Sequence, residues 1–383
     1  MMFGREWVRR EPHSSGNFSL PSARNRGQIP GVALQHESLA EVLPTHTPAL
    51  FDSAVRRAVE LLRGGDVVAL PTETVYGLAA NALDATAVAK IYKIKGRPAH
   101  NPIIVHVADV AMARRCVSDW PEAADKLVAS FWPGPLTLVL RKSEAIPGIV
   151  AAGGETVGVR WPSHPFIQAV IRACGFPLAA PSANLSNQIS PTSAAHVRES
   201  LGAKLRLIVD GGQSQVGIES TVLDLTTHPP QVLRPGMIHA ESLQAALHGL
   251  AEIGDGLGLR PSSLVPRTSV GPLRSPGQLR RHYSPKAKLV VLQWRDDAEL
   301  LSQLSTLNSQ LSLTHVIAHS HIPSGAGLGG VSVIPHDAEA YARALYAELH
   351  RCDAEGASCI VVETLPAGPE WQAIADRLQR AAG

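Results

Sequence analysis

Hydrophobic and polar residues follow two different periodicities along the chain. From Ser53 to Gly65 the apolar residues recur at the spacing of one helix face, and the closing glycine pair is typical of a helix C-cap. Further on, short and continuous apolar runs are typical of buried strands. These runs are Val67–Leu70, Ile103–Val107, Leu136–Leu140, Val157–Val159, Leu205–Val209 and Thr221–Leu225. Helical patterns separate several of them, so we predict an α/β sheet flanked by helices.

A second series of strand and helix patterns begins after residue 285. Residues 251–285 are rich in Gly, Pro, Ser and Arg and show no sustained period, which is typical of a linker. Beyond them, apolar strands and amphipathic helices alternate as in a small Rossmann-like unit. The predicted organisation is a flexible N-terminal extension over 1–50, a larger α/β domain over 51–250, a linker or lid over 251–285 and a small Rossmann-like α/β domain over 286–383.

One glycine motif in the second unit has the spacing of a dinucleotide-binding loop but not its context. Gly325, Gly327 and Gly330 have the spacing G-x-G-x-x-G, but the phosphate-binding version follows a strand and opens a helix. Here the residues that follow have the pattern of a strand. We therefore predict a flexible loop at this place and no dinucleotide site.

The composition narrows the class of protein. The chain has 383 residues, of which 45% are hydrophobic and 18% charged, and its net charge of +2 provides no general attraction for nucleic acid. Its 4 cysteines form no CxxC pair, which favours reduced thiols and a cytoplasmic location. No apolar run approaches the roughly 20 residues that span a bilayer, so we expect no membrane insertion. Any anion site must therefore be built locally.

A basic turn is the first candidate for such a site. Lys95 and Arg97 stand two residues apart, after a helical pattern and before Pro98. Gly96 tolerates a positive φ, and Pro98 disfavours helix at Arg97, so both cations are expected on a turn from which they can reach one anion. Taken alone, this pair also fits a solvated surface loop.

Polar clusters at the ends of other apolar runs favour a pocket. Open α/β sheets bind ligands at strand ends, and hydroxyls, amides and guanidiniums there suit a polyphosphate and a carboxylate. Each cluster alone is also compatible with ordinary turn formation. The clusters are Thr72, Glu73, Thr74 and Tyr76, then Ser182 and Asn184, then Ser220 and Thr221, with Arg160 and Arg234 on further loops.

These segments resemble the motif series of the threonylcarbamoyl-AMP synthases, the YrdC-like domain family. The similarity rests on "ALPTETVYGL", "KIKGRPAHNPIIVHV", "PLAAPSANLSNQISPT", "DGGQSQVGIESTVLDL" and "VLRPGMI", which lie in order between about residues 52 and 245. "SPGQLRRHYSPKAKL" and the Rossmann-like unit are similar to the long, two-domain form of the family. The resemblance implies a YrdC-like twisted open sheet followed by a linker and the small second domain.

The resemblance also implies an activity. It is the condensation of L-threonine, bicarbonate or CO2, and ATP to L-threonylcarbamoyladenylate and pyrophosphate. Mg²⁺ is expected with the ATP, although its protein ligands stay unknown. The product would pass to a tRNA threonylcarbamoyltransferase complex, and we expect no direct tRNA binding.

Site residues follow from the same resemblance. Lys95 and Arg97 match the family's Lys-x-Arg signature and are the expected catalytic pair. The expected ATP-binding set is Lys95, Arg97, Ser182, Asn184, Arg160, Thr221, Arg234 and the linker residue Tyr283. The expected threonine-binding set is Thr72, Thr74, Arg97, His106, Thr137 and Ser220.

Two other functions are compatible with a related fold. The chain could be an RNA-binding module that acts directly on tRNA or ribosomal RNA, but the low net charge and the few aromatic residues speak against it. A carbamoyltransferase of hydrogenase maturation carries a similar domain, but that reading expects zinc-finger cysteine pairs, which this sequence lacks.

Overall fold

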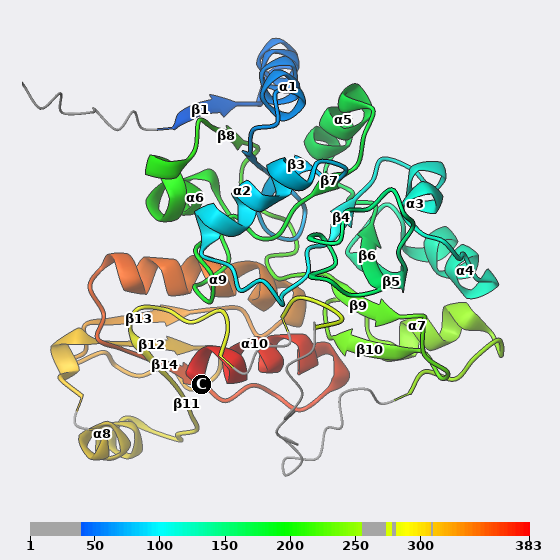
Figure 1. Cartoon of the computed structure of the whole chain (residues 1–383). Helices are drawn as coiled ribbons and strands as arrows, with labels where there is room; N and C mark the ends of the chain where they lie inside the picture. Colours follow the sequence, from blue (N-terminus) through cyan, green and yellow to red (C-terminus); the bar gives the residue numbers. More distant parts are fainter. Residues whose placement is uncertain (1–39, 255–272, 278–280, 308) are drawn as a thin grey trace, which may run out of the picture. The chain divides into compact units, whose positions relative to one another are not determined.

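The structure is a computed structural model that describes residues 40–254, 273–277, 281–307 and 309–383. Two sheets organise these residues (Figure 1). The larger sheet has 10 strands in the order β1-β8-β2-β3-β7-β4-β6-β5-β9-β10, and the smaller has 4 strands in the order β11-β14-β12-β13. The predicted α/β class is confirmed.

The large sheet is mixed, because short hairpins alternate with helical crossovers. Its strands are β1 (Glu41–Pro44), β2 (Val68–Leu70), β3 (Gly77–Asn81), β4 (Val105–His106), β5 (Leu136–Arg141), β6 (Thr156–Arg160), β7 (Leu178–Ala179), β8 (Leu207–Asp210), β9 (Thr221–Asp224) and β10 (Gln231–Arg234). Its helices are α1 (Pro48–Arg63), α2 (Ala85–Lys95), α3 (Val110–Cys116), α4 (Glu122–Phe131), α5 (Pro165–Cys174), α6 (Ala194–Leu201) and α7 (Ala240–Leu247). β2 and β3 pair antiparallel, so the loop between them is a tight return that carries Thr72 and Thr74.

Helix α2 ends where the sequence predicts the basic turn. The Asp84 carboxylate accepts from the backbone N–H groups of Thr86 and Ala87 and starts the helix. Gly96 ends it in the left-handed conformation, at φ 59°. Lys95 is therefore the last helical residue, and Arg97 begins the loop.

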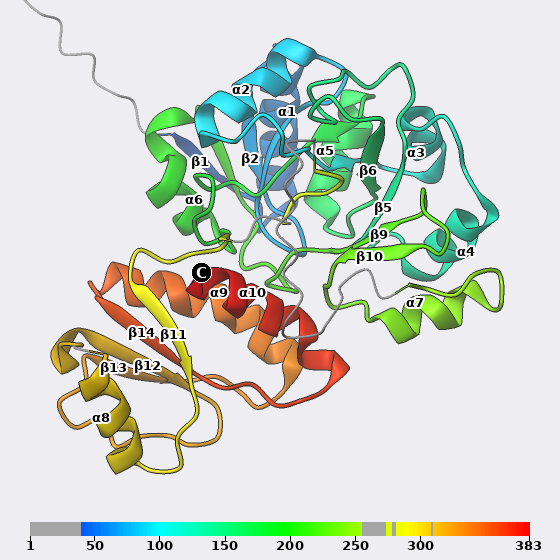
Figure 2. The same cartoon turned by 60° about the horizontal axis from the view of Figure 1, so that its bottom comes forward.

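The small sheet is entirely parallel, as in a Rossmann-like unit. Its elements are β11 (Lys288–Leu292), α8 (Asp297–Thr306), β12 (Thr314–Ala318), β13 (Gly330–Val333), α9 (Ala338–Ala354), β14 (Cys359–Glu363) and α10 (Gln372–Ala382). Figure 2 shows α8 on one side of this sheet and α9 with α10 on the other. Successive residues of β12 face opposite sides of the sheet: Ile317 packs toward α9 and α10, and Val316 packs toward α8.

Two differences from the sequence expectations stand out. The predicted extension over 1–50 ends too late, because β1 pairs with β8 and α1 begins at Pro48. Residues 1–39, and much of the predicted linker, lie outside the described residues. Strands β3, β7 and β10 were not predicted, since each is short or built from small residues. β13 begins at Gly330, so the glycine motif leads into a strand as expected.

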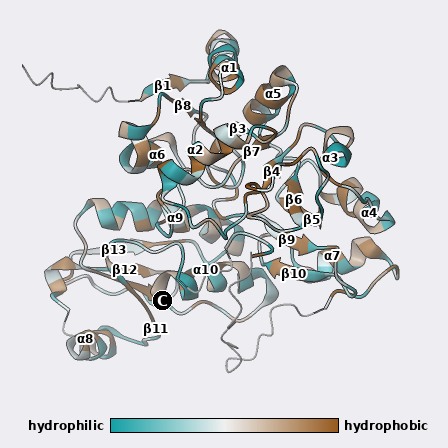
Figure 3. Cartoon of the chain, viewed as in Figure 1, coloured by the Kyte–Doolittle hydropathy of each residue, from teal (hydrophilic) through white to brown (hydrophobic). Residues whose placement is uncertain are grey.

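Hydropathy follows the layers (Figure 3). Brown, apolar residues line the strands and the helix faces turned toward them, and the hydrophilic residues cover the outer faces. All 4 cysteines are buried and free. Among the described helices, none combines the length and the apolar character needed to cross a bilayer.

Candidate active site

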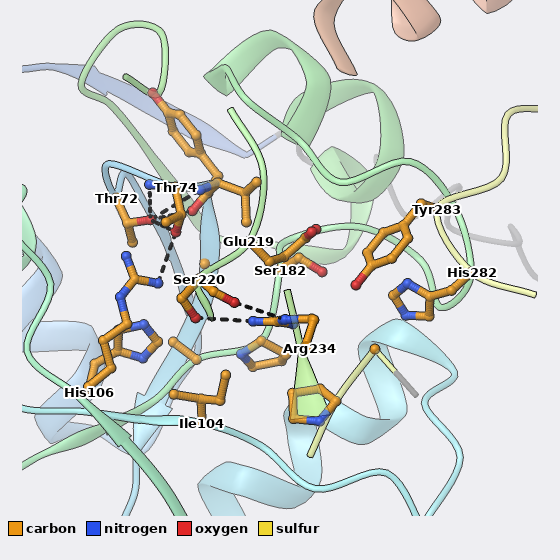
Figure 4. Close-up of a pocket in the computed structure, with 18 of the residues that line it drawn as sticks. Thr72, Thr74, Ile104, His106, Ser182, Glu219, Ser220, Arg234, His282 and Tyr283 are labelled. Carbon is orange, nitrogen blue, oxygen red and sulfur yellow. Dashed lines mark hydrogen bonds between the residues drawn. The ribbon is translucent and has the colours of Figure 1, made fainter. Parts of the chain in front are cut away.

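A pocket of the large sheet collects most of the predicted polar residues (Figure 4). They reach it from the β2–β3 loop, from β4 and β6, from the loop after β7, and from the adjacent ends of β9 and β10. The predicted residues that line it are Thr72, Thr74, Arg97, His106, Arg160, Ser182, Ser220, Arg234 and Tyr283. Three arginines and four small hydroxyl residues therefore converge on one hollow.

Arg160 is held on the threonine-rich loop by a buried ion pair. Its guanidinium lies 2.7 Å from the Glu73 carboxylate and donates to the Thr74 hydroxyl at 2.9 Å. Burial alone would raise the pKa of Glu73, but the positive charge and hydrogen bond of Arg160 outweigh it and lower that pKa. Glu73 is thus ionised and fixes the orientation of Arg160.

Arg234 and two hydroxyls form a second wall. Arg234 donates through Nε to the Ser220 carbonyl at 3.0 Å and through Nη2 to the Ser220 hydroxyl at 3.1 Å. Thr137 does not line the pocket, but its hydroxyl lies 2.8 Å from that of Ser220. Thr221 is directed away, since its hydroxyl donates to the carbonyl of Ile238 at 2.8 Å.

Lys95 holds the loop of the Ser-x-Asn signature and does not line the pocket. Its ammonium group donates to the carbonyls of Ser182 at 2.6 Å and Asn184 at 2.5 Å, and to the Asn184 side-chain oxygen at 3.2 Å. An ammonium group has three donors, and these contacts use all three. Asn184 is also turned inward, because its side-chain oxygen accepts from the Ser182 hydroxyl at 2.6 Å. Lys95 thus ties the two signatures together, and of their four residues Arg97 and Ser182 reach the pocket.

Arg97 does face the pocket, although one side of its guanidinium is anchored. It donates through Nε to the carbonyl of Asn101 at 2.9 Å, and through Nη2 to that of Pro102 at 2.6 Å. Burial lowers the pKa of Arg97 to about 10, so the group is a cation at neutral pH. These contacts fix it before any substrate arrives.

His106 contributes a neutral ring. Burial, followed by the charge of Arg160, lowers the pKa of His106 to about 3. Its Nδ1 atom is buried and has no hydrogen-bond partner among the described residues. The ring is therefore suited to one hydrogen bond with a bound molecule and carries no charge toward it.

The linker closes the pocket on the remaining side. Pro276, Gly277, His282 and Tyr283 line it, and the free cavity is only ≈ 50 Å³, which is room for a few water molecules. A Cβ atom at Gly277 would lie 2.7 Å from the Tyr283 hydroxyl, so only glycine permits this approach. Tyr283 itself is buried and adopts a φ of 63°. A cavity of this size does not hold a nucleotide.

A buried ion pair connects the pocket with the small domain. Arg377 of α10 lies 2.7 Å from the Glu219 carboxylate, which also accepts from the Ser190 hydroxyl at 2.6 Å. The Arg377 guanidinium lies 5.2 Å from the centre of the Tyr283 ring. Burial would raise the pKa of Glu219, but Arg377, Arg234 and Ser190 together hold it at about 2. Arg377 therefore contacts both Tyr283 of the linker and Glu219 of the pocket wall.

Sequence reasoning missed Glu219 and Arg377. Glu219 lines the pocket directly before Ser220, and the signal available was an acid inside an otherwise polar, glycine-bearing loop. Metal ligands were not predicted, and among the described residues no three His, Cys, Asp or Glu side chains are grouped to hold an ion. Glu219, which lines the pocket, and Glu73, which lies beside it, are each paired with an arginine.

This fold and pocket define an α/β enzyme built for anionic substrates. The family model Sua5_yciO_yrdC, described as "Telomere recombination", matches residues 60–236, and the model "Threonylcarbamoyl-AMP synthase, C-terminal domain" matches residues 238–383. The chain belongs to the family of threonylcarbamoyl-AMP synthases, in its two-domain form.

Individual relatives agree with the family models. The threonylcarbamoyl-AMP synthase of Pyrococcus abyssi is 38% identical over 86% of this chain and 94% of its own length. That of Bacillus subtilis is 38% identical over 87% of this chain and 94% of its own length. The crystal structure of P. abyssi Sua5 complexed with L-threonine superposes with a TM-score of 0.78 and 35% identity, covering 90% of this chain and 98% of that one. The chain therefore has both domains of these relatives.

Proposed function

We propose that the chain condenses L-threonine, bicarbonate and ATP to L-threonylcarbamoyladenylate and releases pyrophosphate. The observation that carries the proposal is the convergence of Arg97, Arg160 and Arg234 with a set of hydroxyls on one pocket. A structural relative that is complexed with L-threonine supports threonine as one substrate.

The reaction joins two anions. The threonine amine attacks the carbon of CO2 and loses a proton, which gives a carbamate. With bicarbonate, a C–O bond of the bicarbonate also breaks, and the oxygen leaves as water with the amine proton. A carbamate oxygen then forms a bond to the α-phosphorus of ATP, while the bond from that phosphorus to the bridging oxygen breaks and pyrophosphate leaves. The carbamate and the triphosphate repel each other in water, so fixed guanidiniums lower the barrier by positioning both and by neutralising charge.

We assign the pocket residues to the two substrates. Thr72, Thr74, His106 and Ser220, with Thr137 behind Ser220, would hold threonine, and Arg97 would lie between the substrates. Arg160, Arg234, Ser182 and Tyr283 would hold ATP. Lys95, Asn184 and Thr221 would act indirectly, because they tie down backbone and do not face the pocket.

Mg²⁺ is the proposed companion of ATP. Mg²⁺ is commonly held by phosphates and water with few protein ligands. The described pocket offers no unpaired carboxylate, so no step is assigned to the ion.

We further propose that the product passes to a tRNA threonylcarbamoyltransferase complex in the cytoplasm. The RNA-binding alternative is not favoured. Arg97, Arg160 and Arg234 are only 9%, 4% and 4% exposed and face a small pocket, whereas a polynucleotide backbone is bound along an open basic surface.

Pyrophosphate release tests the proposal. Release should require threonine, bicarbonate and ATP together, and Arg97→Ala should lower kcat by roughly 100-fold or more, as expected when a fixed charge at a reacting group is lost. Lys93→Ala is the matched control, since Lys93 belongs to the same basic turn but is exposed. Turnover without threonine, or a fully active Arg97→Ala variant, would refute the assignment.

A further inference from the structure

The small domain has a polar cluster that the proposed reaction does not use. It lies where three parallel strands end: His319 and Ser320 follow β12, His336 follows β13 and Glu363 closes β14. Carboxyl ends of parallel strands are the usual ligand edge of an open α/β sheet.

The tautomer of His319 is fixed by its surroundings. The side chain is only 4% exposed, and its Nε2 atom lies 3.1 Å from the carbonyl oxygen of Thr364. A carbonyl only accepts, so Nε2 carries the hydrogen and, in the neutral ring, Nδ1 presents a lone pair. This arrangement, with one ring nitrogen bonded to a backbone carbonyl and the other free, is the one that metal-ligating histidines adopt.

Three atoms meet at that lone pair. His319 Nδ1 lies 3.2 Å from His336 Nδ1 and 2.8 Å from Ser320 Oγ, and Ser320 Oγ lies 2.9 Å from His336 Nδ1. With neutral rings, at most two hydrogens are available for these three contacts, namely those of the serine hydroxyl and of His336 Nδ1. The three contacts share these two hydrogens, and a cation bound by the two ring nitrogens would take their place.

We propose that this edge binds a divalent transition-metal ion through His319 Nδ1 and His336 Nδ1. Two nitrogens, each about 2.0–2.1 Å from a tetrahedral zinc ion, lie about 3.4 Å apart, close to the separation in the structure. Imidazole nitrogens suit Zn²⁺, Ni²⁺ and Cu²⁺, whereas Mg²⁺ and Ca²⁺ prefer oxygen ligands.

The charge and the access also fit a cation. Glu363 is 4% exposed in its side chain and lies 3.9 Å from His319 Nδ1, so a buried negative charge lies near the nitrogen that would bind the ion. Ser320 and His336 are exposed, which leaves the opposite side open to solvent. Because the set has two classical ligands and a hydroxyl, water completes the coordination, and the ion is held more weakly than in a four-ligand structural site.

A Co²⁺ titration of the tag-free full chain tests the site. Visible absorption of bound Co²⁺ should report one equivalent that Zn²⁺ displaces. His336→Ala removes one of the two nitrogens and should weaken this binding by at least ~10-fold, since even the loss of an outer-shell partner costs that much. Pyrophosphate release by this variant should equal that of the wild type, because His336 lies outside the catalytic pocket.

His321→Ala is the matched control. His321 belongs to the same loop and is 51% exposed, but its Nδ1 lies 2.8 Å from Glu363 and takes no part in the group of three atoms. The control should bind Co²⁺ as the wild type does. Equal binding by wild type and His336→Ala, or no Co²⁺ bound by the wild type, would overturn the proposal. Melting without metal verifies that each variant is folded.

Discussion

Replacement of Arg377 by methionine is expected to destabilise the protein strongly. The guanidinium is 0% exposed and bonds to Glu219, to the carbonyl of Pro235 at 3.0 Å and to Asp376 at 2.7 Å. Methionine fills similar space but leaves the Glu219 carboxylate buried without its cation. Removal of one member of a buried ion pair costs about 3–5 kcal/mol of unfolding free energy.

The pKa of Glu219 gives the scale of the stabilisation that Arg377, Arg234 and Ser190 together provide against burial. It falls from an ordinary value of 4.5 to about 2 in the folded chain, and at about 1.4 kcal/mol for each unit this corresponds to ~3 kcal/mol. Because the folded-state pKa is the lower one, ionised Glu219 stabilises the fold above pH 4.5. This contribution is lost as the pH falls from 4.5 toward 2. The gap between wild type and variant should narrow over the same range.

Urea unfolding at pH 7, repeated between pH 5 and pH 3, measures both effects. Arg295→Met is the matched control, because Arg295 pairs with Glu299 on the surface of the same domain and is 84% exposed. It should change the urea midpoint little. The double variant Glu219→Gln with Arg377→Met should recover part of the loss, since no charge stays buried alone. An Arg377→Met midpoint equal to that of the wild type would refute the reasoning.

Three further results are expected. Lys95→Met should raise the Michaelis constant for ATP in pyrophosphate release by roughly 10-fold, because the buried carbonyls lose their donor. Lys95→Arg should not restore the wild-type constant. An unchanged Michaelis constant would contradict a positioning role for Lys95. Tyr283→Ala should alter the Michaelis constant for ATP, and unaltered constants for both ATP and threonine with unaltered turnover would rule out its place in the site. Burial lowers the pKa of His196 and His350 from 6.5 to about 4, so the neutral rings stabilise the fold above pH 6.5 and this stability declines as the pH falls toward 4. Melting temperatures across that range should fall less steeply for His350→Gln than for the wild type, and equal slopes would refute this.

Short sequence patterns predicted those parts of the fold that depend on neighbouring residues in the chain. Gly96 adopts the left-handed conformation that its place after a helical pattern suggests, so the turn before Pro98 is where the sequence predicts it. Long apolar runs such as Leu136–Leu140 are strands within one residue of the prediction. The predicted run Ile103–Val107 contains β4, whereas the two-residue strand β7 exists only through pairing with β3 and β4, which no local pattern encodes.

The sequence predicted which residues belong to the candidate site better than it predicted how their side chains are arranged. Residue types at strand ends indicated that Arg160 and Arg234 belong to one pocket, and both line it. The spacing of Lys95 and Arg97 suggested a shared anion, but Lys95 turns to carbonyls that lie 87 residues or more further along the chain. The partner of Glu219 is 158 residues away, so only the assembled structure reveals it.

Glu363 has a consequence for the small domain as a whole. Its carboxylate accepts from the backbone N–H groups of His319, Ser320 and His321 at 2.7, 2.9 and 3.1 Å, which is the role that a nucleotide phosphate plays in many proteins with this sheet. The chain thus carries its own substitute for that phosphate. A nucleotide phosphate approaching this turn would meet a fixed negative charge and N–H groups that are already bonded, so this strand end is closed to phosphate.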